Sequence, residues 1–165
     1  MNVIFLDVDG VLNSQQTDER CNGVIGIDSD KVARLAEIVR SNDAILLLTS
    51  SWRLHWWKPE KAGDEQHPLG EYLDKKLAEY NLKIYDIVPY AGFGRGKAIL
   101  KWLDTTDLEV NKFIILDDEM FDYGDDDVRL RGYVVKTSFY GEQGGLQDLH
   151  IKEADRKFKK QVDRS

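Results

Sequence analysis

The chain has 165 residues, 42% of them hydrophobic and 32% charged, and a formal net charge of −7. This length suits one domain with a substantial core, so we expect a single domain over residues 1–165. The negative charge argues against broad attachment to nucleic acid or anionic membranes, and no apolar run approaches the ~20 residues that span a bilayer. The single cysteine, Cys21, excludes an internal disulfide, and the chain enters its first strand without a basic leader. Both features predict a cytoplasmic protein.

The first apolar run, residues 3–6, is continuous and rich in branched side chains, which predicts a buried strand. A polar loop or flap over 12–27 follows, and then a helix over about 31–40. Later apolar runs predict strands over 44–48, 84–88, 113–116 and 133–135. Helical spacing predicts helices near 69–80, after the glycine turn at 92–96, and from about 146, whereas 52–68 is predicted to be irregular. Strands that alternate with helices predict an α/β fold with a mostly parallel sheet.

Polar side chains directly follow three of these strands. They are Asp7 and Asp9, Thr49 and Ser50, and Asp117 and Asp118. The carboxyl ends of parallel strands meet at one edge of a sheet, where open α/β folds bind ligands, and Lys97 after the glycine turn can reach the same edge. Carboxylates hold Mg²⁺, and the metal with Lys97 would neutralise a phosphoryl group in transfer. One carboxylate is then free to attack phosphorus and form an aspartyl-phosphate.

Each piece also has a structural interpretation. Asp9-Gly10 is a common hairpin signal, Thr49 can belong to a helix cap or a turn, and Lys97 can be an ordinary exposed helix residue. The glycine turn is not a P-loop, because Ala91 stands where glycine is needed and Ala98 where a hydroxyl should bind Mg²⁺. FIILDDE at 113–119 resembles the opening strand of a receiver domain, but in such a domain the acidic pair comes first, and the roughly 46 residues after Glu119 are too few for the remainder.

The motifs DVDGV at 7–11, LLLTS at 46–50, Lys97 and ILDDE at 115–119 occur in this order, and together they resemble the haloacid dehalogenase (HAD) superfamily of phosphohydrolases. The resemblance implies a three-layer HAD-like Rossmannoid α/β fold. With about 16 residues in the first cap position, we expect a minimal cap and an open site.

The resemblance also assigns roles. Asp7 would be the nucleophile and a metal ligand, and Asp9 the general acid and base, with its backbone carbonyl on the metal. Thr49, or Ser50 if the register is shifted by one, would bind the phosphoryl group. Lys97 would neutralise charge. Asp117 and Asp118 would complete the Mg²⁺ site, and Asp122 would be a more distant acidic partner.

FLDVDGVLNS, TSSWR, RGKAILKWL and the late GGL are similar to the small HAD domains of the Swiss Army Knife RNA-repair group. The resemblance implies a phosphorylated substrate, with a polynucleotide end as one candidate. Arg53 is predicted to hold a phosphate, and Trp52 and Trp56 to stack on a base. The alternatives are a HAD-type phosphotransferase or mutase, and a HAD-like module that binds metal or phosphate without catalysis. Oligomeric state is left open.

Overall fold

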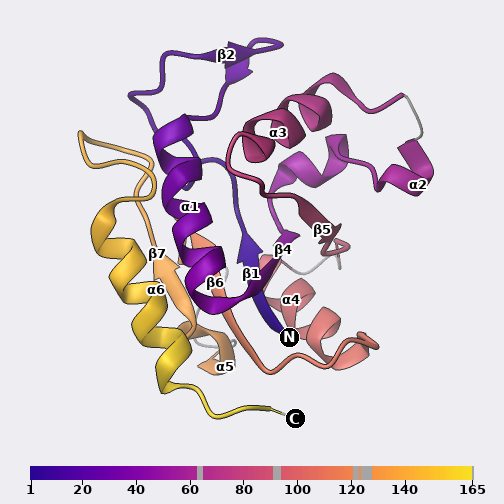
Figure 1. Cartoon of the computed structure of the whole chain (residues 1–165), viewed down its shortest axis with the longest axis vertical. Coiled ribbons are helices and arrows are strands. Elements are labelled where there is room, and N and C mark those ends of the chain that lie inside the picture. The colour runs from indigo at the N-terminus through magenta and orange to yellow at the C-terminus, as the bar shows by residue number, and fades with distance from the viewer. Residues whose placement is uncertain (63–64, 91–93, 121–122, 124–127, 165) are drawn as a thin grey trace.

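The computed structural model describes residues 1–62, 65–90, 94–120, 123 and 128–164. Within these ranges, five parallel strands form one sheet in the order β5–β4–β1–β6–β7 (Figure 1). Their bounds are β1 Asn2–Leu6, β4 Ala44–Leu48, β5 Ile84–Ile87, β6 Lys112–Asp117 and β7 Val134–Lys136. The central strands β1, β4 and β6 are almost wholly apolar and buried, as expected for parallel strands covered on both faces.

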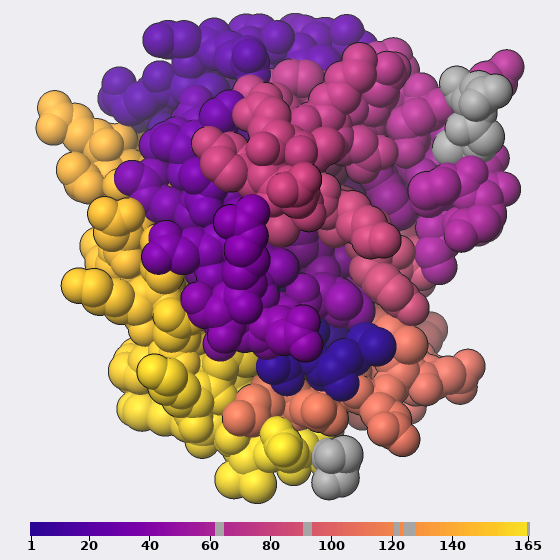
Figure 2. Space-filling model, viewed as in Figure 1, coloured from indigo at the N-terminus to yellow at the C-terminus, as the bar shows by residue number. Residues whose placement is uncertain are grey.

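Helices cover both faces of the sheet. Their bounds are α1 Ser29–Asn42, η1 Ser51–His55, α2 Pro59–Ala62, α3 Pro68–Ala78, α4 Arg95–Thr105, α5 Val128–Arg131 and α6 Asp148–Lys160. Apolar residues of α1, α3 and α6 pack on one face, and those of α4 and α5 on the other. Figure 2 shows α6 in yellow, α1 in purple and α3 in rose side by side over the first face. The predicted three-layer α/β architecture with a parallel sheet is therefore confirmed.

The segment between β1 and α1 is short and carries a small antiparallel hairpin, β2 Arg20–Cys21 and β3 Val24–Ile25. The sequence predicted only a loop or flap here. The base of the segment is firmly anchored, because Asn13, Ser14 and Thr17 are buried. The late glycines, Gly144 and Gly145, allow the chain before α6 to lie directly against Ser14 and Asn13.

The prediction that residues 52–68 are irregular was wrong in part. Ser50 caps the 3₁₀ helix η1 by accepting a hydrogen bond from the backbone N–H of Trp52, and α2 follows at Pro59. Both helices, η1 and α2, are too short to show a helical spacing of apolar residues, so the tryptophans and prolines of this segment gave no sign of them in the sequence. Within the described ranges, none of the helices is both long and apolar enough to cross a membrane.

Candidate active site

The register of the three central strands sets the site. Leu6 of β1 pairs with Leu48 of β4 on one side and with Leu116 of β6 on the other. Their successors, Asp7, Thr49 and Asp117, therefore lie level at the carboxyl edge of the sheet. Backbone hydrogen bonds fix this level: Asp7 donates to the carbonyl of Leu116 at 3.0 Å, and Thr49 donates to the carbonyl of Leu6 at 2.9 Å. Residues 110 positions apart in the chain are thus held side by side.

Asp7, Asp117 and Asp118 form a carboxylate cluster, in which one oxygen of each lies within 4.8 Å of the others. Asp7 and Asp117 are almost inaccessible to solvent. Burial raises the pKa of the Asp7 carboxyl well above its usual value, the charge on Asp117 raises it further, and Arg95 opposes both. Burial likewise raises the pKa of Asp118. Such crowding of negative charge favours a cation at this point.

Arg95, at the start of α4, supplies positive charge to this cluster. Its Nη1 lies 2.6 Å from Oδ2 of Asp117 and 3.3 Å from Oδ2 of Asp7. Burial disfavours the guanidinium charge, but Asp7 and Asp117 outweigh it and raise the pKa of Arg95 above its usual value. Arg95 therefore remains charged, and among the described residues it offsets part of the charge of three carboxylates.

Asp117 is the most firmly held member of the cluster. Its Oδ1 accepts a hydrogen bond from the backbone N–H of Glu119 at 3.0 Å, and its Oδ2 accepts one from the hydroxyl of Tyr123 at 2.9 Å. Tyr123 is fully buried, and burial followed by the charge on Asp117 raises the pKa of its hydroxyl. Tyr123 therefore stays neutral and acts as a hydrogen-bond donor that fixes the orientation of Asp117.

Gly10 allows the loop after β1 to approach Asp118. Its φ is +82°, and a Cβ at this position would lie 2.3 Å from Oδ2 of Asp118. The backbone N–H of Gly10 donates to Oδ1 of Asn13 at 2.9 Å, and its carbonyl accepts a hydrogen bond from the hydroxyl of Thr137. Glycine is needed here both for its left-handed backbone and for the space that its missing side chain leaves.

Asp9 lies at the edge of the site, half-buried, and both of its carboxylate oxygens accept hydrogen bonds. Asn13 donates from Nδ2 to Oδ1 at 2.9 Å, and Trp52 donates from Nε1 to Oδ2 at 3.3 Å. The same Asn13 amide donates to the carbonyl of Gly26, which ties Asp9 to the base of the hairpin segment. Asp9 is therefore held in one orientation near the cluster without belonging to it.

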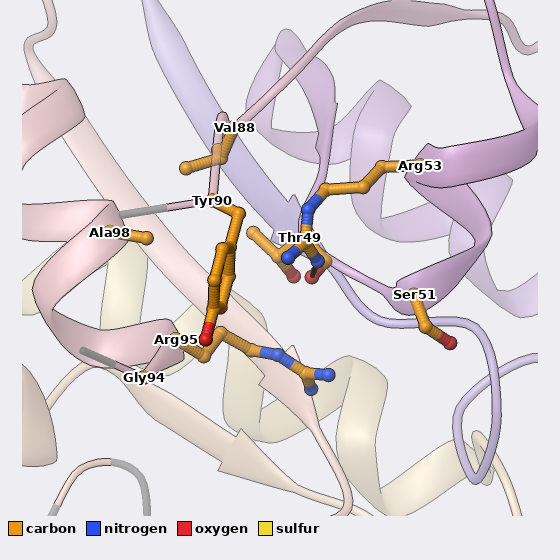
Figure 3. A pocket seen from close by; sticks show the side chains of 8 residues that line it. All are labelled: Thr49, Ser51, Arg53, Val88, Tyr90, Gly94, Arg95 and Ala98. Atoms are coloured by element: carbon orange, nitrogen blue, oxygen red, sulfur yellow. Dashed lines mark hydrogen bonds between the residues drawn. The ribbon is translucent and has the colours of Figure 1, made fainter. Parts of the chain in front are cut away.

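Thr49 and Arg53 line a cavity of about 200 Å³ beside the cluster, together with Tyr90 and Arg95 (Figure 3). The hydroxyl oxygen of Thr49 is buried and has no hydrogen-bond partner in the described part of the chain. Arg53 donates from Nη1 to the backbone carbonyls of Thr49 and Ser50 at 2.8 and 3.0 Å. Burial and the nearby charge of Arg95 lower the pKa of Arg53. A buried hydroxyl in a cavity that two guanidinium groups also line suits an oxyanion.

Comparison with protein families identifies the chain. Residues 3–150 match the family described as the HAD domain in Swiss Army Knife RNA repair proteins. The chain belongs to this family. Comparisons with curated proteins and with solved structures found no match. Membership confirms the predicted HAD-like Rossmannoid fold and supports phosphohydrolase-type chemistry in general, for which HAD proteins usually use a metal ion.

Among the described contacts, Arg95 is a cation that reaches Asp7 and Asp117, whereas the sequence pointed to Lys97, whose predicted role stays a prediction. Lys97 lies two residues further along α4, on the exposed side of the helix. The position of each residue around the axis of α4 distinguishes Arg95 from Lys97. Arg95 shares its stripe with Ile99 and Trp102, which pack on the sheet, whereas Lys97 shares its stripe with the exposed Lys101.

The tryptophans predicted to stack on a substrate lie inside this HAD domain. Trp52 is 5% exposed and Trp56 is 3% exposed, and the indole N–H of Trp56 donates to Oδ1 of Asp74 at 2.8 Å. Neither ring offers a free face to a base, so the structure assigns Trp52 and Trp56 to packing and to hydrogen bonding. Ser50 is occupied as the cap of η1, which leaves Thr49 as the unpaired hydroxyl. Asp122 lies outside the described residues.

The carboxylate cluster of the HAD domain fits a divalent cation. Its side-chain donors are carboxylate oxygens, which Mg²⁺ prefers, and they are gathered where the charge of Arg95 does not balance them. The backbone carbonyl of Asp9 was a further predicted ligand. The sequence had indicated Asp7, Asp117 and Asp118, but not the second layer of Arg95, Tyr123 and Asn13, which depends on contacts between distant segments.

Proposed function

We propose that this HAD domain is a Mg²⁺-dependent phosphomonoesterase that acts through an aspartyl-phosphate on Asp7. The observation that carries the proposal is the convergence of Asp7 with Asp117, Asp118 and Arg95 beside the unpaired hydroxyl of Thr49. Asp7, Asp117 and Asp118 would hold the Mg²⁺, which would supply charge neutralisation to the phosphoryl group when bound. The proposed substrate is a phosphate on a nucleotide or at a polynucleotide end, in keeping with the RNA-repair family.

In the first proposed step, a carboxylate oxygen of Asp7 attacks phosphorus, and the bond from phosphorus to the ester oxygen breaks. Asp9 gives its proton to the departing alkoxide, which leaves as the alcohol. Thr49 and Arg95 hold the non-bridging oxygens through hydrogen bonds that strengthen as negative charge moves onto them. Asn13 and Trp52 keep the Asp9 carboxyl aimed at the leaving group.

In the second step, Asp9 accepts a proton from water, and the resulting hydroxide oxygen bonds to phosphorus. The bond from phosphorus to Asp7 breaks, so inorganic phosphate leaves and the Asp7 carboxylate is restored. The short segment over 12–27 adds a two-stranded hairpin and no cap domain. This segment therefore provides no cap to exclude water, which favours hydrolysis over transfer to a second substrate.

The test is phosphate release with and without Mg²⁺ from p-nitrophenyl phosphate, mononucleotides, sugar phosphates, and RNA or DNA with 5′- or 3′-phosphate ends. Wild type should release phosphate only with Mg²⁺, and Asp7→Asn should release none while unfolding cooperatively like wild type. Asp9→Asn should give a burst of one p-nitrophenolate per chain and then turn over slowly, because this leaving group departs without a proton. Wild-type rates in Asp7→Asn would exclude the covalent mechanism, and phosphate capture by an added alcohol in preference to water would indicate a phosphotransferase.

A further inference from the structure

Beside the cavity that holds Thr49, Arg53 and Arg95 lies a second cavity of about 100 Å³. The two share a wall made of Tyr90 and Ala98. The second cavity is otherwise lined by Pro89, Lys101, Trp102 and Thr105. One cavity thus offers cations and a buried hydroxyl, and its neighbour offers mainly aromatic and aliphatic surface. Tyr90 stands between them.

Tyr90 is unusual for its exposure. It is 67% exposed, although it follows the edge strand β5 and adjoins two cavities. The guanidinium carbon of Arg53 lies 5.5 Å from the centre of its ring, so the ring and Arg53 support each other at the cavity mouth. Figure 3 shows the side chains of Tyr90, Arg53, Arg95 and Thr49 converging on one space from two stretches of the chain, the end of β4 with η1 and the end of β5 with α4. An exposed ring that packs against Arg53 and lines the same cavity as Arg95 presents its other face to an incoming ligand.

We propose that Arg53 and Tyr90 form the recognition site for a phosphorylated nucleoside. Its phosphate lies with Thr49, Arg53 and Arg95 in the first cavity, and its base packs on the Tyr90 ring toward Trp102 in the second. The proposal rests on the proposed phosphatase function and adds the residues that select the substrate. A sugar phosphate fits less well, because the second cavity offers few polar groups to its hydroxyls. A base gains from stacking on an aromatic ring whatever its sequence.

The chain also contains a matched control for Tyr90. Tyr85 is 40% exposed, and the ammonium group of Lys58 lies 5.8 Å from the centre of its ring. Tyr85 therefore repeats the pairing of an exposed tyrosine with a cation on the same edge of the sheet, but it lines neither of the two cavities. If an exposed tyrosine beside a cation served only local packing, Tyr85 and Tyr90 would behave alike on substitution.

The experiment measures kcat and KM for adenosine monophosphate, for an RNA trinucleotide with a terminal phosphate, and for glycerol phosphate. The proteins are wild type, Tyr90→Ala, Tyr90→Phe and Tyr85→Ala. Tyr90→Ala should raise KM for the nucleotide substrates about tenfold and change kcat far less, because stacking is lost before and during the reaction alike. The preference for nucleotides over glycerol phosphate should fall by the same factor. Tyr90→Phe should restore it, and Tyr85→Ala should match wild type.

An equal effect on adenosine monophosphate and the trinucleotide supports recognition of the terminal nucleoside itself, and an effect on the trinucleotide alone supports recognition at a strand end. An unchanged preference in Tyr90→Ala overturns the inference and leaves the phosphatase function standing. If wild type releases phosphate from no substrate, the proposed function fails, and calorimetry with adenosine monophosphate then decides the inference separately. A tenfold weaker Kd in Tyr90→Ala than in Tyr85→Ala supports it, and equal values overturn it.

Discussion

Nη1 of Arg95 lies 2.6 Å from Oδ2 of Asp117, across 22 residues of chain and at the edge of the sheet where the acidic side chains gather. The contact joins the first residue of α4 to the last residue of β6. It brings a fixed positive charge to a place that the sequence assigned to Lys97. The two cations are close enough in the chain for a direct comparison by substitution.

Arg95→Ala should lower kcat/KM by about 100-fold or more, because a charge aimed at the transferring phosphoryl group is lost. Lys97→Ala should change kcat/KM by less than about threefold, because an exposed charge contributes little. Steady-state phosphate release at saturating Mg²⁺ measures both. The reverse ranking would return the role to Lys97, and equal losses would mean that both cations act on the phosphate.

Gly10→Ala should weaken Mg²⁺ binding as well as the fold. The new Cβ would lie 2.3 Å from Oδ2 of Asp118, so the Asp118 carboxylate would have to move. In addition, the left-handed backbone conformation costs about 1–2 kcal/mol for an L-residue. Gly23→Ala is the matched control, because Gly23 has a φ of +81° and nothing within 4 Å of its Cβ position. Both variants should unfold at lower temperature, but only Gly10→Ala should lose Mg²⁺ affinity by calorimetry. Equal Mg²⁺ affinities would show that Asp118 moves without consequence.

Trp52→Phe should slow catalysis while leaving substrate binding intact. It keeps a large buried ring but removes the N–H that donates to Asp9 at 3.3 Å, and hydrogen bonds to charged groups contribute about 1.5–3 kcal/mol. We expect kcat for nucleotide substrates to fall about tenfold, with little change in KM. Trp56→Phe removes an equivalent N–H donated to Asp74 and should leave kcat unaltered. If both variants match wild type, Trp52 serves packing alone.

Metal-free stability should depend on pH through Asp7. Its pKa is raised in the folded protein, so the folded state holds a proton on Asp7 at pH values at which the unfolded chain has lost it. The free energy of unfolding therefore falls as pH rises from about 4, the usual carboxyl pKa, through the raised pKa of the folded state. Asp7→Asn cannot titrate and should become progressively more stable than wild type over this window. Urea unfolding in a chelating buffer at several pH values measures the difference, and added Mg²⁺ should reduce it. Parallel pH profiles would contradict this reading of Asp7.

The central part of the fold could be read from the sequence because its signals are local. The apolar runs that became β1, β4 and β6 are continuous, and each ends in the polar residues that reach the site. Parallel register then brings Asp7, Thr49 and Asp117 level without any further information. The predicted α/β class and the carboxylate cluster both follow from this periodicity and this register.

The surroundings of the site were harder to predict because they depend on long-range contacts. Tyr123 follows an acidic motif, and nothing in the sequence around it indicates its hydrogen bond to Asp117. Asn13, which donates hydrogen bonds to Asp9 and to the carbonyl of Gly26, lies in a loop without any periodic pattern. Tryptophans near a candidate phosphate site suggested stacking, but their indole N–H groups found carboxylate partners that allow both rings to be buried. The phase of α4 did separate Arg95 from Lys97, and only the apolar stripe of that helix contains this information.

The strand order separates the residues of the proposed reaction from those of the proposed recognition site. Asp7 and Thr49 follow inner strands and Asp117 ends one, and these strands are paired on both sides. Tyr90 follows the edge strand β5, which is paired on one side. Amide protons of β1, β4 and β6 should therefore exchange with solvent more slowly than those of β5. Mutations around Tyr90 can accumulate at a peripheral strand with little effect on the innermost one. Substitutions near the edge strand can thus change substrate preference, while the residues on the inner strands that form the proposed reaction centre stay the same.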